Sequence, residues 1–126
     1  MQKQIVQTNA APAPIGPYSQ AVLAGGMLYI SGQIALSATD GTLTIGDIRE
    51  ETEVIMHNLK AILSAAGAGF EHVVKTTIFL LDMSSFAEVN EVYGRYFPEN
   101  PPARETVAVR GLPRGVNVEI SMIAAV

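Results

Sequence analysis

Residues 73–81 read Val-Val-Lys-Thr-Thr-Ile-Phe-Leu-Leu, and this segment constrains the fold more than any other part of the chain. It is rich in β-branched residues and apolar at nearly every position, which is typical of a central strand covered on both faces. The rest of the sequence predicts only two helices, and two helices can cover one face of a sheet. We therefore expect a second copy of the chain to cover the other face.

Three strands are predicted before this segment. Residues 4–7 form a short one, and residues 19–24 and 27–33 flank a Gly-Gly pair of the kind that closes a hairpin. Residues 10–17 are rich in proline and alanine, and we expect them to pack against the domain as an ordered arm.

Two helices are predicted from apolar spacing and capping residues. Asp47 and Glu50 form a capping box ahead of apolar residues at helical spacing, and Gly67 ends this first helix. Ser84 or Ser85 caps the second helix, which carries its apolar side chains along one side.

The last two strands are predicted to form a hairpin, in which residues 104–109 pair with residues 116–122. Alternation sets the register, because a slip by one residue would set core valines against Asn117 and Glu119. In this register the valines of both strands share the core face. The opposite, polar face then carries five side chains together: Arg104, Thr106, Asn117, Glu119 and Ser121.

The element order β-β-β-α-β-α-β-β predicts a two-layer α+β domain, a mixed six-stranded sheet with two helices on one face. A chain of 126 residues is long enough for one domain with a real core, so we interpret residues 1–126 as a single domain. Hydrophobic residues make up 48% and charged residues only 16%. This composition is apolar for a small soluble monomer and supports a partner at the surface.

Composition also excludes several classes of function. The net charge is −4 and the eight lysines and arginines are scattered, so we expect no nucleic-acid partner and no membrane partner. Cysteine is absent, and His57 and His72 are unrelated in spacing, so no metal site is predicted. No cofactor-binding fingerprint is present, and we expect no cofactor. The first twenty residues lack a signal-peptide pattern, which favours a cytoplasmic protein.

Arg104 is the first candidate functional residue, because it stands at the head of an otherwise apolar strand. Its planar guanidinium suits a carboxylate, so a small organic acid is a natural ligand. A structural ion pair with Glu119 is equally compatible with the sequence. Glu119 itself lies between two core residues, where partial desolvation raises a carboxyl pKa and suits a general base acting on water. The alternative is that Glu119 only satisfies Arg104.

Four further residues are weaker candidates. Asn90 has poor helix propensity in the second helix, although a solvated position explains it as well. Tyr18 could bring its hydroxyl to a pocket or simply pack under the proline-rich arm. Ser31 and Gly32 end a strand, where glycine lets backbone N–H groups approach a ligand or marks a bulge.

Several motifs together resemble a known family. They are Ala13-Pro14-Ile15-Gly16-Pro17-Tyr18-Ser19-Gln20-Ala21, Ile30-Ser31-Gly32-Gln33, Phe79-Leu80-Leu81-Asp82-Met83 with Phe86, Asn90 and Tyr93, and Pro102-Ala103-Arg104 with Leu112-Pro113 and Val118-Glu119-Ile120. This combination resembles the RidA family, also called YjgF/YER057c/UK114, over nearly the whole chain. The resemblance implies a chorismate-mutase-like fold, a homotrimer with pockets at the subunit interfaces, and damage-control deamination of 2-iminobutanoate and 2-iminopropanoate to 2-oxo acids and ammonia.

The resemblance also implies roles for individual residues. Arg104 would hold the carboxylate of a small 2-imino or 2-oxo acid, helped by backbone groups at Gly32 and Thr106. Glu119 would position or activate the attacking water. Residues matching pocket-lining positions, contributed across the interface, are Tyr18, Ser31 and Asn90. Thr106 stands where many members have cysteine, and Ser121 where an acidic residue is frequent, so substrate preference is left open.

Two other functions are compatible with the same residues. The first is a binding module that senses a 2-oxo acid without turning it over. The second is the endoribonuclease or translation-inhibitor activity associated with some members of the family, which the acidic balance of the chain disfavours.

Overall fold

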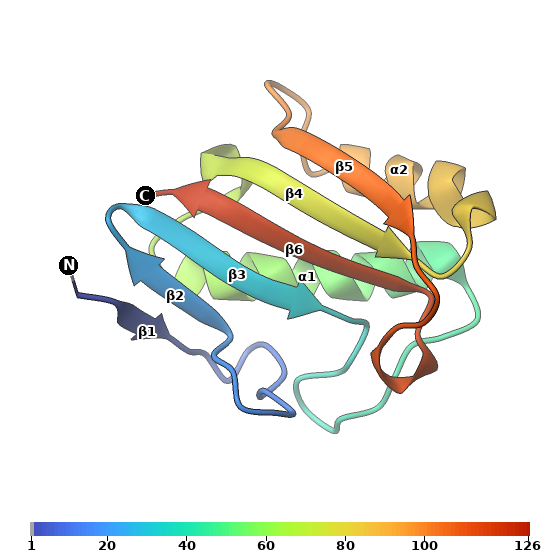
Figure 1. The fold of residues 1–126 in the computed structure, drawn as a ribbon, viewed down its shortest axis with the longest axis horizontal. Coiled ribbons are helices and arrows are strands. Elements are labelled where there is room, and N and C mark those ends of the chain that lie inside the picture. The colour runs from blue at the N-terminus through green and yellow to red at the C-terminus, as the bar shows by residue number, and fades with distance from the viewer. Residues whose placement is uncertain (1) are drawn as a thin grey trace.

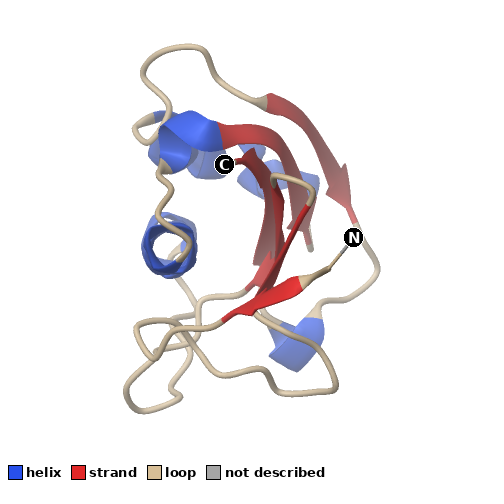
Figure 2. Ribbon diagram, turned by 90° about the vertical axis from the view of Figure 1, so that its left-hand side faces the viewer, coloured by secondary structure: helices blue, strands red, loops and turns tan. Residues whose placement is uncertain are grey.

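A computed structural model describes residues 2–126 as one mixed sheet with two helices packed on one of its faces (Figures 1 and 2). The strands are β1 (Gln4–Val6), β2 (Ala21–Ala24), β3 (Met27–Gln33), β4 (Val73–Leu80), β5 (Ala103–Ala108) and β6 (Val118–Ala125). The helices are α1 (Ile48–Ala65) and α2 (Phe86–Gly94), with short 3-10 turns η1 (Phe70–His72), η2 (Met83–Ser85) and η3 (Pro113–Gly115). The predicted two-layer α+β architecture is confirmed.

The strand order is β1-β2-β3-β6-β4-β5, and of these neighbours only β4 and β5 run parallel. The predicted Gly-Gly hairpin joins β2 to β3, because Gly25 and Gly26 both adopt positive φ values of 59° and 77°. Both β6 and β4 are interior strands with a partner on each edge, and β4 is the apolar segment on which the sequence prediction rested.

The predicted pairing of the last two strands is wrong. β5 pairs with β4 in parallel and β6 pairs with β4 in antiparallel, so β4 lies between them (Figure 1). The connection through η3 carries the chain past β4 instead of turning it back on itself. Burial favours this arrangement, because β6 buries every second side chain whereas β5 buries none fully and suits an edge.

The real pairing also corrects which side chains share a face. Arg104 lies opposite Thr76 and Thr106 opposite Ile78, and both β4 residues are fully buried on the helix side. Glu119 lies opposite Phe79, on the open side. Arg104 and Thr106 therefore lie on one face of the sheet and Glu119 and Ser121 on the other, contrary to the predicted shared face.

Helix α1 begins at the predicted Asp47 cap and ends at the predicted Gly67, although within residues 2–126 the Glu50 side chain makes no return hydrogen bond to complete the capping box. The Asp47 side chain accepts hydrogen bonds from the N–H groups of Arg49 and Glu50, at 2.9 and 3.1 Å. Gly67 takes a φ of 73° just after the helix, and the N–H of Ala68 returns to the carbonyl of Leu63. The second helix differs in detail, because Asp82 caps the preceding turn η2 and Ser85 makes no side-chain cap.

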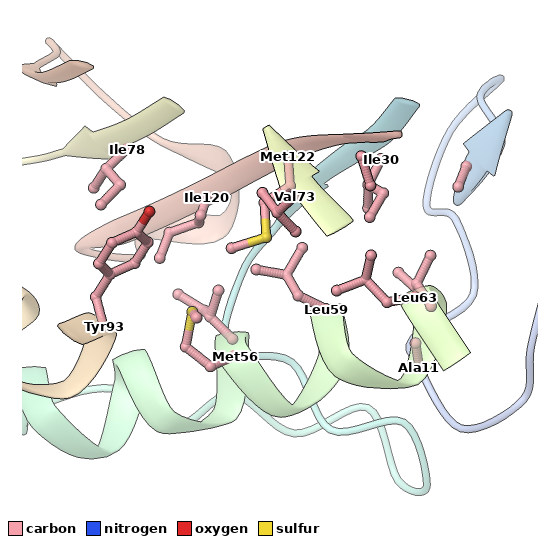
Figure 3. Packing of buried hydrophobic residues seen from close by; sticks show 14 of the residues in the cluster. Ala11, Ile30, Met56, Leu59, Leu63, Val73, Ile78, Tyr93, Ile120 and Met122 are labelled. Carbon is pink, nitrogen blue, oxygen red and sulfur yellow. The ribbon is translucent and has the colours of Figure 1, made fainter. Parts of the chain in front are cut away.

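The core lies between the sheet and the two helices. Leu59 and Leu63 of α1 face Met122 and Ile30 of the sheet, and Tyr93 reaches from α2 toward Ile120 (Figure 3). Neither α1 nor α2 lies on the opposite face of the sheet (Figure 2). Large apolar side chains remain exposed on that face, including Tyr29 at 48% and Val107 at 40%.

No helix in residues 2–126 is both long enough and apolar enough to span a membrane.

Candidate functional site

A cavity of about 360 Å³ lies on the side of the domain where the arm meets the ends of β3 and β6. Its walls bring together four of the predicted site residues: Tyr18, Ser31, Gly32 and Glu119. The rest of the lining is mainly apolar, with Pro12, Ala13, Ile15, Ile34, Leu36 and Pro113 alongside Gln20 and Gln33. Aliphatic walls around one carboxylate form a site for a small polar ligand with a short apolar part.

Glu119 reaches into this cavity across Gly32. A Cβ atom at position 32 would lie only 2.8 Å from the carboxyl carbon of Glu119, so no residue larger than glycine fits without moving the carboxylate. Gly32 lies at an irregularity in the pairing of β3 with β6, between Ile30 and Gln33. The glycine is therefore needed for close approach.

The Glu119 side chain is half-buried, and burial raises the pKa of its carboxyl group above the ordinary value. Neither an ion pair nor a hydrogen bond to another side chain occupies this carboxylate within residues 2–126. A raised pKa makes this carboxylate a stronger base than an ordinary glutamate, which suits it to accept a proton from a water molecule.

The arm that forms one wall of the cavity is fixed by Gln20, which is buried. Its Nε2 donates to the carbonyl oxygens of Thr8 and Pro12 at 3.0 and 2.8 Å, and its Oε1 accepts from the N–H of Thr8 at 2.7 Å. Ser31 Oγ donates to the carbonyl of Ser19 at 2.6 Å. Ser31 thus fastens β3 to the residue that follows Tyr18.

Tyr18 directly follows the arm, lines the cavity and is 48% exposed. Its hydroxyl oxygen accepts a hydrogen bond from the N–H of Ile15 at 3.3 Å. The hydroxyl hydrogen remains free to donate to a ligand.

Arg104 lies away from this cavity, on the helix side of the sheet. Its guanidinium carbon is 5.6 Å from the ring centre of Phe86 and 5.1 Å from that of Tyr93, both from α2. It takes part in no ion pair within the described part of the chain. The expected alternative, a structural ion pair between Arg104 and Glu119, is therefore wrong, and the cause is the strand order described above.

Thr106 and Asn90 lie on the same side of the sheet as Arg104. Thr106 follows Arg104 by two residues on β5, and its Oγ1 is buried without a hydrogen-bond partner among residues 2–126. Asn90 is half-buried on α2, four residues after Phe86 and three before Tyr93, so it shares the helix face that contacts Arg104. An unpaired buried hydroxyl beside an unneutralised arginine indicates a place for a polar ligand.

The predicted site residues therefore form two groups, which β4 and the thickness of the sheet separate. Tyr18, Ser31, Gly32 and Glu119 line the cavity, whereas Asn90, Arg104 and Thr106 lie together at α2 and β5. One subunit does not bring its arginine and its glutamate together.

Comparison with known proteins identifies the family. A family model described as "Endoribonuclease L-PSP" matches residues 8–126, which is nearly the whole chain. This chain belongs to that family, the RutC/RidA family.

Individual members support the assignment. The 2-iminobutanoate/2-iminopropanoate deaminase of Mus musculus is 48% identical over 122 residues, which cover 97% of this chain and 90% of that protein. The crystal structure of the Rid protein YyfA from Yersinia pestis is similar with a TM-score of 0.97 and 43% identity, over 99% of this chain and 100% of that one. E. coli TdcF, solved with bound serine, has a TM-score of 0.93 and 37% identity, over 98% of each chain.

Glu51 is a residue of this RidA-family chain that the sequence interpretation missed. It is fully buried on α1, and its Oε2 accepts from the N–H groups of Asn117 and Val118 at 2.8 and 2.9 Å, while Oε1 accepts from Asn117 Nδ2 at 2.9 Å. It thereby anchors the residues that immediately precede Glu119. The available signal was its spacing, because Glu51 lies four residues before the buried Ile55 on the apolar face.

The described residues hold no cluster of three or more His, Cys, Asp or Glu side chains suited to a metal ion.

Proposed function

We propose that this protein hydrolyses small 2-imino acids, such as 2-iminobutanoate and 2-iminopropanoate, to the 2-oxo acid and ammonia. The observation that carries the proposal is the Glu119 carboxylate, which lies unpaired over Gly32 in a largely apolar cavity and has a raised pKa. The name of the Mus musculus relative supports this reaction, and the serine bound to E. coli TdcF supports a ligand with a carboxylate and a nearby nitrogen.

The proposed chemistry needs only orientation and one base. In the protonated imine, the oxygen of a water molecule bonds to the imine carbon as the π electrons of the C=N bond move to the nitrogen, and one proton of that water passes to Glu119. Glu119 then returns this proton to the nitrogen. As the carbon–nitrogen bond breaks and ammonia leaves, the hydroxyl oxygen forms the carbonyl double bond of the 2-oxo acid and gives its proton to Glu119, which releases it to solvent. Positioned proton transfer of this kind contributes about 10²–10⁴-fold to a rate.

We propose that Arg104 binds the substrate carboxylate, with Thr106 and Asn90 beside it, and that this group meets the Glu119 group of a neighbouring subunit. Each group is incomplete alone, because one holds the cation and the other the base. The open apolar face of the sheet supports such an assembly, since exposed Tyr29 and Val107 would be covered by another copy. A homotrimer closes this head-to-tail contact with three equivalent sites.

A coupled assay tests the reaction. Threonine dehydratase or an amino-acid oxidase generates the imine, and the decay of the imine is followed with and without the protein. We expect the wild-type protein to accelerate decay and Arg104→Ala to abolish that acceleration while the thermal unfolding temperature stays within a few degrees. Unchanged imine decay with the wild-type protein would refute the proposal.

The same purified protein also tests the two alternative functions. Tight binding of 2-oxobutanoate by calorimetry without imine turnover would favour a sensor. The family description also names endoribonuclease activity. RNA is a polyanion, whereas this chain carries a net charge of −4, and its Arg49, Lys75 and Arg95 lie in ion pairs with glutamates. Salt-dependent cleavage of RNA that is lost in Arg104→Ala would favour the nuclease.

A further inference from the structure

The guanidinium of the half-buried Arg104 lies against two aromatic rings and not against a carboxylate within residues 2–126. Phe86 and Tyr93 occupy positions seven residues apart on α2, which are two helical turns, so both rings project toward β5. The centre-to-carbon distances of 5.6 and 5.1 Å are those of cation–π contacts.

This kind of contact has a chemical consequence for the arginine. A carboxylate partner would neutralise the charge and occupy the N–H groups at the edge of the guanidinium plane. An aromatic ring attracts the cation without accepting those N–H groups as a carboxylate does. The charge and the hydrogen-bond donors of Arg104 therefore stay available to an incoming anion.

The two rings are held differently. Tyr93 is buried, its hydroxyl donates to Thr76 Oγ1 at 3.0 Å, and its ring packs on Phe97 with centroids 4.8 Å apart. Thr76 is also the residue opposite Arg104 in the β4–β5 pairing. Phe86 lies in the first turn of α2 with 38% of its surface exposed. Tyr93 is thus part of the core, whereas Phe86 can be changed at little cost to folding.

We propose that Phe86 and Tyr93 are positioning residues for Arg104, a two-ring seat that holds the guanidinium ready to bind a small carboxylate. The inference rests on the proposed function, because it takes Arg104 as the carboxylate-binding group. It assigns the rings a role in ligand affinity that is separate from their packing. Loss of a ring should weaken carboxylate binding more than it slows the proton transfer, because the two rings contact Arg104 and not Glu119.

The test compares four variants with a matched control. Phe86→Leu and Tyr93→Leu remove a ring, whereas Phe86→Tyr and Tyr93→Phe keep one. Phe70→Leu is the control, because the Phe70 ring packs against Tyr96 and Phe97, with centroids 5.1 and 5.4 Å away, and only Phe86 and Tyr93 form the cation–π contacts of Arg104. The measurements are the Kd of 2-oxobutanoate by calorimetry, the KM and kcat for the imine, and the thermal unfolding temperature.

We expect Phe86→Leu to raise both Kd and KM about three- to tenfold while kcat stays within about twofold, which is the size of one cation–π contact. Phe86→Tyr should restore both constants. Tyr93→Phe should lower the unfolding temperature, because the bond to Thr76 is lost, yet keep the affinity, since the ring remains. Tyr93→Leu should weaken binding and also lower the unfolding temperature, because Tyr93 is buried, whereas Phe86→Leu reports on binding with little effect on folding, because Phe86 is exposed.

The outcomes separate this inference from the proposed function. In one outcome the wild-type protein binds 2-oxobutanoate and hydrolyses the imine, but Phe86→Leu has the same Kd and KM as wild type and Phe70→Leu. The two rings then have no role in binding, and this inference is overturned while the proposed function stands. If the wild-type protein neither binds 2-oxobutanoate nor accelerates imine decay, the proposed function fails and the inference falls with it.

Discussion

Glu119 and Gly32 are the residue pair on which the proposed chemistry depends. The carboxylate occupies the space that a side chain at position 32 would fill, and burial raises its pKa. Sequence alone indicated both residues, because a glutamate between core residues and a glycine at a strand end are unusual. Their contact could not be read from the sequence, since it crosses from β6 to β3 at an irregularity in the register.

A methyl group at position 32 should abolish the proposed imine hydrolysis without unfolding the protein. Gly32→Ala displaces the Glu119 carboxylate, and a misplacement of about 1 Å costs on the order of 10²-fold in kcat. The matched control is Gly111→Ala, because a Cβ at Gly111 meets nothing within 4 Å. Steady-state imine hydrolysis measures both variants, and full activity of Gly32→Ala would show that the position of Glu119 is not critical.

The raised pKa of Glu119 predicts a pH-dependent stability difference. Because the pKa of Glu119 is higher in the folded state than in the unfolded state, this carboxyl group makes the folded state less stable as pH rises. The loss begins near the unfolded pKa, about 4.5, and is complete above the folded pKa. Glu119→Gln removes this effect, so at pH 7 we expect it to raise the free energy of unfolding by less than about 1 kcal/mol. Below about pH 4 the difference should vanish.

Denaturant unfolding at the two pH values measures the change. A variant that is less stable than wild type at pH 7 would contradict the desolvation of Glu119.

At the level of elements, β4 decides how the other strands are arranged. Its apolar pattern correctly predicted an interior strand with a partner on each edge, while cover on both faces stays a prediction, and the helices and the Gly-Gly hairpin followed from local signals. The pairing of β5 with β6 was predicted wrongly, because alternation shows which residues share a strand face but not which strand lies next to it. Whether β5 or another strand pairs with a given edge of β4 depends on all the strands of the sheet together. The position of β5 at the edge therefore could not be predicted from its own residues.

Glu51 links helix α1 to the start of β6 and should contribute strongly to stability. Glu51→Leu leaves two buried N–H groups and the Asn117 amide without their acceptor, which should lower the free energy of unfolding by about 2–4 kcal/mol. Glu51→Gln keeps one acceptor oxygen and should lose less than half as much. Urea unfolding measures both, with the exposed Glu50→Gln as the control. Equal losses for leucine and glutamine would contradict the anchoring role.

At the scale of the whole molecule, the open sheet face and the two separated groups of site residues point to the same assembly. The sequence predicted a covering copy from β4, and this stays a prediction for a face on which Tyr29 and Val107 are exposed in one chain. What the sequence could not provide was the separation of Arg104 from Glu119, because that follows from the strand order.

Light scattering should give a mass about three times the 13.4 kDa of one chain. A charge on the open face, as in Val107→Asp, should shift the protein toward smaller species, since an unpaired charge in an apolar interface is costly. A wild-type monomer at micromolar concentration would contradict a site shared between copies.

Mixing two inactive variants tests the shared site most directly. Arg104→Ala keeps Glu119, and Glu119→Gln keeps Arg104, so a mixed trimer of the two holds one interface at which both residues are intact. Co-expression of the two chains in equal amounts should therefore recover about a quarter of wild-type imine hydrolysis, although each variant alone is inactive. Activity that stays at the level of the separate variants would contradict a site built from two subunits.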